Sequence, residues 1–170
     1  MKETRSDQLL SLCGLNCGLC PQNIGDYCIG CTRGEDQPDC AFAVCNKKTD
    51  HVDYCFECSK YPCRLLIERT RCDSIITHQH QIRDLDKARH GGLEAYAEEQ
   101  RQKQEILKQL LQGIEANQRV TIFQAVNLLE VPDLLPLLEL SSGQQVISQI
   151  QEVAFQKNIS LELRTPFPSY

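Results

Sequence analysis

The chain of 170 residues lacks the features that would mark it as a membrane or secreted protein. No run of about 18 apolar residues occurs, so the sequence predicts no membrane-spanning helix and no membrane partner. The amino-terminal segment MKETRSDQLLSL is polar and lacks the apolar core of a signal peptide. We therefore expect a protein of the reducing cytoplasm.

An excess of positive charge is also missing. The chain has 18 lysines and arginines against 23 aspartates and glutamates, a formal net charge of -5. General binders of nucleic acid need cationic side chains facing phosphate, so no nucleic-acid partner is expected. No glycine-rich phosphate loop is present either. The modest basic patch of Lys60, Arg64, Arg69 and Arg71 is expected to offset nearby negative charge.

Large apolar residues are sparse in residues 13–63. A segment of this size with so few of them buries too little surface to fold on an apolar core alone. Bound metal can replace such a core, because structural zinc supplies on the order of 10–16 kcal/mol of apparent binding free energy in finger peptides.

Residues 13–63 are instead rich in cysteine. Ten of the eleven cysteines of the chain lie in it: Cys13, Cys17, Cys20, Cys28, Cys31, Cys40, Cys45, Cys55, Cys58 and Cys63. Three pairs have two residues between the thiols, the spacing at which one tight turn directs two sulfurs at one metal ion. The sequence therefore predicts an amino-terminal metal-binding module that contains all ten as candidate ligands.

Disulfide and redox interpretations are weaker. A reducing compartment and an odd number of cysteines disfavour a disulfide framework. A thioredoxin-type pair needs a preceding βαβ unit, which the sequence does not predict. The remaining cysteine, Cys72, stands alone and is expected to be a structural thiol.

The grouping of the ten thiols stays open. Zinc favours four tetrahedral ligands, so two pairs close one site. The most local grouping joins the pairs Cys17/Cys20 and Cys28/Cys31, with a second site from Cys40/Cys45 and Cys55/Cys58. A cross-braced arrangement is equally compatible with the order along the chain. Cys13 and Cys63 then complete a third site, replace a member of either site, or stay free.

Histidine is a minor candidate for this chemistry. His51 lies between two cysteine pairs and could substitute as a ligand, but an exposed loop histidine is the favoured interpretation. His78 and His80 could meet a metal ion on one side of a strand, although solvated side chains are favoured there too.

Iron is the main alternative to zinc. Cys13, Cys17 and Cys20 have the C-x3-C-x2-C spacing of radical S-adenosylmethionine enzymes. The chain is too short for a barrel of that kind, which takes about 200 residues or more. An iron–sulfur cluster of ferredoxin type remains compatible with the paired cysteines. We favour zinc and keep the iron–sulfur cluster as the alternative.

The rest of the chain predicts a mostly helical fold with little β structure. Apolar spacing and turn signals predict helices beginning near Pro62 and covering 93–114, 121–130 and Ser141 or Ser142 to Asn158, followed by a short strand at 159–163. Thr121 is a candidate N-cap, and the middle of the 93–114 helix is expected to be solvated. We divide the chain into a cysteine module, residues 1–63, and a helical region, residues 64–170, packed as one unit.

The order CGL-x-CGxCP, CxGC, a spaced C…C pair and CxxCxxYPC resembles the cysteine-rich family catalogued as domain of unknown function 3795. The segments ARHGGLEAYAEEQRQK, AVNLL and NISLELR are also similar to parts of longer members. The resemblance implies that the ten cysteines of residues 13–63 are the family's cysteine positions and that they bind metal. It implies no established activity.

A closed four-thiolate zinc site leaves no position for a reactive water, which disfavours catalysis. The sequence therefore predicts a metal-binding protein whose module organises a surface for a protein partner. The alternative is an iron–sulfur protein in electron transfer or redox sensing. An enzyme would require a metal with only three protein ligands.

Overall fold

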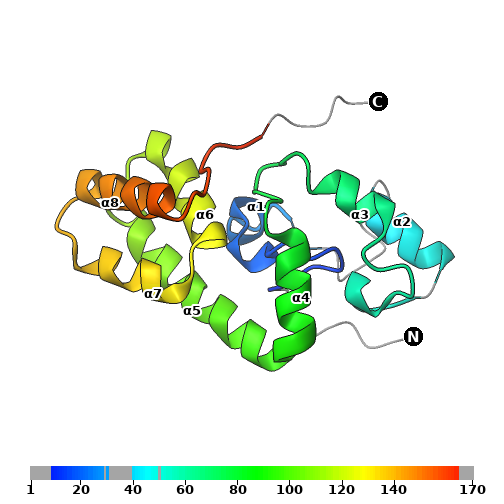
Figure 1. The fold of residues 1–170 in the computed structure, drawn as a ribbon. Coiled ribbons are helices and arrows are strands. Elements are labelled where there is room, and N and C mark those ends of the chain that lie inside the picture. The colour runs from blue at the N-terminus through cyan, green and yellow to red at the C-terminus, as the bar shows by residue number, and fades with distance from the viewer. Residues whose placement is uncertain (1–8, 29, 31–39, 50, 165–170) are drawn as a thin grey trace.

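The computed structural model describes residues 9–28, 30, 40–49 and 51–164, and this part of the chain is mostly helical (Figure 1). The α-helices are α1 (Pro21–Ile24), α2 (Ala41–Lys48), α3 (Arg64–Arg69), α4 (Gln81–Gly91), α5 (Leu93–Leu111), α6 (Arg119–Leu128), α7 (Val131–Leu134) and α8 (Gly143–Gln156). Short 3-10 helices are η1 (Cys17–Leu19), η3 (Cys55–Glu57), η4 (Ala116–Gln118) and η5 (Leu135–Glu139). The mostly helical fold predicted from the sequence is confirmed.

The elements lie in two groups, with α1 and α4 between them (Figure 1). The group formed by α5 to α8 encloses the larger apolar core, which includes Leu107, Ile122 and Ile150 and also receives Leu19 from η1. The smaller core lies towards α2 and α3 and joins Leu10 and Tyr54 of the cysteine module, residues 1–63, to later residues, namely Leu66, Leu85, Ala88 and Tyr96. Each core therefore draws on residues from both sides of Cys63.

Local capping signals account for the helix ends that the sequence predicted well. Gly92 has φ of 91° and separates α4 from α5, directly before the helix predicted over 93–114. Ser142 caps α8 by accepting the Gln145 N–H at 3.3 Å. Asn158, just beyond the end of α8, has φ of 54°, a left-handed conformation typical of a helix stop.

Three helical expectations were wrong or incomplete. Helix α4 was not predicted, because its residues are mostly polar and give a weak apolar pattern. Thr121 is not an N-cap, since η4 runs directly into α6, which begins at Arg119. The middle of α5 is not solvated throughout, because Gln100 and Lys103 are buried there.

The short strand expected at 159–163 was wrong, because the described part of the chain contains no β-strand. The alternation of apolar residues is real, since Ile159 and Leu161 pack against the larger core. No second strand lies beside this segment in the described structure, so its backbone bonds elsewhere. The Arg164 N–H donates to the Asp73 carboxylate at 2.8 Å, and the Gln79 side chain donates to the Ser160 carbonyl oxygen at 3.1 Å.

No helix in the described ranges combines the length and the apolar character needed to cross a membrane.

Candidate metal centre

Two of the closely spaced cysteine pairs form tight 3-10 turns. The Cys20 N–H donates to the Cys17 carbonyl oxygen at 3.0 Å in η1, and the Cys58 N–H donates to the Cys55 carbonyl oxygen at 3.2 Å in η3. The Glu57 carboxylate supports the second turn by accepting the Asp53 N–H at 2.8 Å. Both turns have the compact backbone that brings the two thiols of a pair near each other.

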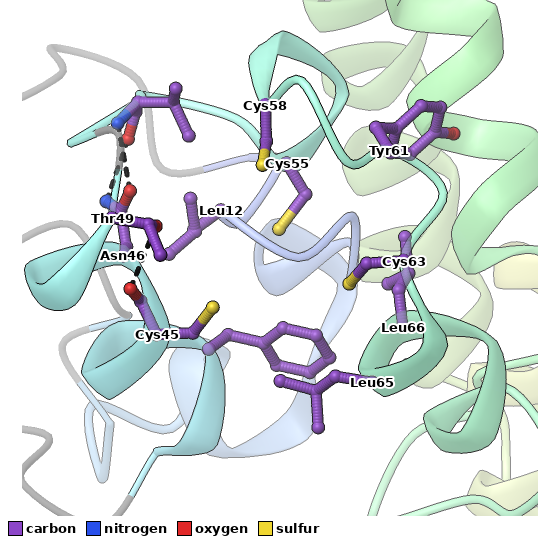
Figure 2. Close-up of a pocket in the computed structure, with 12 residues that line it drawn as sticks. Leu12, Cys45, Asn46, Thr49, Cys55, Cys58, Tyr61, Cys63, Leu65 and Leu66 are labelled. Atoms are coloured by element: carbon purple, nitrogen blue, oxygen red, sulfur yellow. Dashed lines mark hydrogen bonds between the residues drawn. The ribbon is translucent and has the colours of Figure 1, made fainter.

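Four cysteines line one small cavity in the module (Figure 2). Cys45 comes from α2, Cys55 and Cys58 from the η3 turn, and Cys63 from the position before α3. Figure 2 shows their sulfur atoms turned towards the space between them. The cavity has a volume of about 30 Å³, and the other lining residues include the apolar side chains Leu12, Phe42, Val52, Leu65 and Leu66.

The thiols interact electrostatically. Burial raises the pKa of the Cys55 thiol, and the negative charges of the Cys13, Cys63, Cys58 and Cys45 thiolates raise it further, to about 12. Cys13 is itself buried, with its Sγ 3.3 Å from the Ser11 Oγ. Five thiols therefore share one region, where their ionised forms repel one another unless a positive charge lies among them.

Backbone N–H groups donate to two of the cysteine sulfurs. The Lys60 N–H donates to the Cys58 Sγ at 3.5 Å, and the Gly30 N–H donates to the Cys28 Sγ at 3.4 Å. In both cases the donor lies two residues after the cysteine. A bond from a backbone N–H to sulfur is stronger when the sulfur carries negative charge, as a metal-bound cysteine sulfur does.

Among the described candidate ligands, Cys17, Cys20, Cys28 and Cys40 do not line this cavity. Cys28 folds back on α1, because its N–H donates to the Gln22 carbonyl oxygen at 3.0 Å, only two residues beyond Cys20. Cys31, which the sequence grouped with these cysteines, lies outside the described residues. Cys40 precedes α2 as its N-cap and does not line the cavity, whereas Cys63 does.

No group of three or more Cys, His, Asp or Glu side chains in the described ranges is arranged to hold a metal ion. The four sulfurs nevertheless suit a thiophilic ion by their chemistry, since they surround one apolar cavity. The donor set thus fits a metal, while its present arrangement is not that of a formed site.

The histidines and Cys72 stand outside this centre. His51 is exposed, with φ of 51°, and does not line the cavity. The solvated position expected for His78 was wrong, because its ring nitrogens lie 2.9 Å from the Ser74 Oγ and 3.1 Å from the Arg69 carbonyl oxygen. Burial lowers the pKa of His78. Cys72 is buried, consistent with a structural thiol.

A buried polar group beneath the module was missed by sequence reasoning. The Asn16 Nδ2 donates to the Asp84 carboxylate at 2.8 Å, and the Tyr96 hydroxyl donates to the Asn16 Oδ1 at 2.6 Å. These bonds tie the turn before Cys17 to α4 and α5. Polar residues at helical spacing, Gln81 with Asp84 and Gln100 with Lys103, were the available signal, but such spacing usually marks a solvated face.

Comparison of the chain with protein-family models, curated proteins and solved structures finds no match in any of the three. The resemblance to domain of unknown function 3795 therefore depends on the cysteine pattern and the three similar segments, and it remains a prediction.

Proposed function

We propose that residues 13–63 bind zinc through cysteine thiolates and that the metal holds the module in the shape that a protein partner recognises. The observation that carries the proposal is the set of four sulfurs around one apolar cavity, those of Cys45, Cys55, Cys58 and Cys63. A divalent cation among them would offset the repulsion that raises the pKa of Cys55.

The size of the cavity supports a single ion over a cluster. Its volume of about 30 Å³ suits one small occupant. A cluster of four irons and four sulfides would require the lining side chains to move much further apart. Zinc is also the ion for which four thiolates form a complete structural ligand set.

The same ligand set supports a structural role. Four thiolates fill the coordination sphere of zinc, so the metal keeps no open position for a reacting water. Cys17, Cys20 and Cys28, together with Cys31, are proposed to form a second site on the basis of their spacing. Tyr27, which is 84% exposed beside this second group, supports a contact surface for a partner.

Metal analysis of the purified full-length protein tests the proposal. Protein prepared without oxygen should be colourless and should contain zinc in stoichiometric amount by plasma mass spectrometry. A brown protein with visible charge-transfer bands and bound iron would contradict the zinc proposal and support the iron–sulfur alternative. Protein that contains neither metal and is still fully folded would contradict the proposal.

Variants locate the site within the chain. Cys55→Ser should lose at least one equivalent of zinc and render the module sensitive to protease. Cys72→Ser is the matched control, because this thiol is buried but lies outside the cavity. It should keep the full metal content. For the partner, proteins that copurify with the wild type but not with Tyr27→Ser, at equal zinc content, would identify the contact.

A further inference from the structure

A fifth thiol lies beside the four that line the small cavity of the module. Cys13 belongs to the turn before η1 and is buried, with 7% of its surface exposed. The four sulfurs around the cavity already complete the ligand set that zinc requires, namely those of Cys45, Cys55, Cys58 and Cys63. Cys13 is therefore surplus to that set and is available for chemistry that a zinc ligand does not perform.

The backbone places Cys13 next to Cys55. The Cys55 N–H donates to the carbonyl oxygen of Leu12, the residue before Cys13, at 2.8 Å. Standard bond lengths then hold the Cα atoms of Cys13 and Cys55 about 7 Å apart at most. The Cα atoms of disulfide-bonded cysteines are usually about 4.4–6.8 Å apart. A bond between these two sulfurs therefore requires little movement of the backbone.

The electrostatics of the thiols agree with this placement. Burial is the main cause of the raised pKa of Cys55, and among the neighbouring thiols Cys13 contributes most. Its contribution exceeds that of Cys58, which closes the same 3-10 turn as Cys55. Because the interaction between two charges falls with distance, the Cys13 and Cys55 sulfurs lie close together.

The two thiols differ in their access to solvent. Cys55 is partly exposed, whereas Cys13 is buried. A small oxidant can therefore reach the Cys55 sulfur, and Cys13 meets the oxidised product from inside the fold. Cys45 is more exposed than Cys55, but the bond to Leu12, which brings the Cys13 turn close, is made by Cys55.

We propose that a hydroperoxide joins Cys55 to Cys13 in a reversible disulfide and that this bond opens the zinc site. The inference rests on the proposed zinc site and adds its regulation. Loss of Cys55 from the ligand set leaves zinc with three protein ligands, so the ion is bound more weakly. In a reducing compartment such a disulfide is transient, as disulfides that sense oxidants are.

The chemistry takes two steps. The Cys55 thiolate attacks one oxygen of hydrogen peroxide, so that an S–O bond forms, the O–O bond breaks, and the departing hydroxide takes up a proton and leaves as water. The Cys13 sulfur then attacks the sulfenic acid on Cys55. An S–S bond forms, the S–O bond breaks, and the second hydroxide leaves as water with the proton of the Cys13 thiol. A dithiol such as dithiothreitol reduces the disulfide and restores both thiols.

Peptide mapping of the full-length, zinc-loaded protein tests the inference. After treatment with about one equivalent of hydrogen peroxide, mass spectrometry should find the disulfide between Cys13 and Cys55. A coloured zinc chelator should report the release of about one equivalent of zinc over the same period. Dithiothreitol followed by added zinc should restore the starting metal content. A disulfide between other cysteines in place of this one would overturn the inference, as would full retention of zinc after the disulfide has formed.

A variant tests the part that Cys13 plays. Cys13→Ser should contain as much zinc as the wild type before oxidation, because Cys13 is not in the ligand set around the cavity. Its Cys55 sulfenic acid has lost the neighbouring thiol, so labelling of Cys55 by dimedone should exceed that of the wild type by about tenfold or more. Cys72→Ser is the control, since this thiol is buried outside the cavity, and it should be labelled as weakly as the wild type. Equal labelling of Cys55 in all three proteins would overturn the inference.

Metal analysis before oxidation separates this inference from the function on which it rests. Protein that contains no zinc before peroxide is added would refute both. Zinc-loaded protein in which Cys13 and Cys55 do not become linked would overturn the regulation alone and leave the structural role of zinc intact.

Discussion

The carboxyl group of Asp84 shows how a single buried residue sets a pH dependence. Burial raises its pKa from 3.8 to about 6, although the charge of Lys103 and the Asn16 hydrogen bond act in the opposite direction. The folded-state pKa therefore exceeds the unfolded value. The stabilising contribution of this group is fully present below about pH 4 and is lost as the pH rises through 6.

We expect Asp84→Asn to be more stable than the wild type at pH 7.5 by about 1–3 kcal/mol, since the amide carries no charge to bury. The difference should shrink to nearly zero at pH 4. Urea unfolding at several pH values measures it. A variant that is less stable than the wild type at pH 7.5 would contradict the expectation.

Gly14 occupies a position that other residues cannot adopt without strain. Its φ is 90°, and an added Cβ would lie 2.5 Å from the Leu85 Cγ and 2.6 Å from the Gln81 carbonyl oxygen. Gly14→Ala should therefore destabilise the protein by about 2 kcal/mol or more. Gly113→Ala is the control, because no atom lies within 4 Å of its added Cβ. The denaturant midpoint of Gly14→Ala should lie clearly below that of Gly113→Ala. Equal midpoints would contradict the backbone conformation described at Gly14.

Individual candidate ligands were predictable, but their grouping was not. The spacing of Cys55 and Cys58 predicted a paired turn, and the chain forms one. The most local of the groupings left open by the sequence placed Cys40 and Cys45 beside this pair, whereas the cavity is lined by Cys45 and Cys63. Linear order cannot decide this, because α2 directs Cys45 towards the cavity while Cys40 stays at the start of the helix.

At the scale of elements, residues that mark helix ends predicted the helices better than the apolar or polar composition of the segments did. Gly92 and Ser142 marked the boundaries of α5 and α8 because a positive φ and a capping hydroxyl have local causes. Helix α4 was missed because its buried residues include Gln81 and Asp84. The expected strand failed for a different reason, since a strand needs a neighbour and alternation alone provides none.

An ion pair between Asp73 and Arg164 helps to hold residues 159–164 against the rest of the fold. The Asp73 carboxylate has no exposed side-chain surface and accepts from the Arg164 guanidinium at 2.6 Å and from the His78 N–H at 2.7 Å. Burial alone would raise the pKa of Asp73, but the hydrogen bonds from Arg164 and His78 outweigh it and lower the pKa. The pair therefore stabilises the fold at neutral pH.

Removing one partner of this pair should release the segment. Arg164→Ala leaves Asp73 buried without its counter-ion, and we expect a loss of about 2 kcal/mol, since Arg164 is itself partly exposed. Lys108→Ala is the control, because its pair with Glu105 is exposed on both sides and should contribute less than about 0.5 kcal/mol. If urea unfolding shows that both variants lose the same free energy of unfolding, the Asp73–Arg164 pair contributes no more than an exposed ion pair.

For the whole molecule, the two apolar cores differ in their dependence on the cysteines. The larger core, around Ile122 and Ile150, contains no cysteine among its buried residues. The smaller core packs directly against Cys55 and Cys63. If thiolate-bound metal holds the module, removal of the metal should disturb the smaller core first, because a site that cannot close leaves its surrounding side chains unsupported.

Hydrogen exchange after treatment with a zinc chelator should therefore rise strongly in residues 40–69. It should also rise in α4, which contributes Leu85 and Ala88 to the smaller core. The amides of α6 and α8 should keep most of their protection, since no cysteine is among the buried residues of the larger core. Mass spectrometry of peptic fragments resolves these regions. A uniform rise across the chain would mean that the two cores unfold as one cooperative unit, and no rise anywhere would mean that metal does not hold the module together.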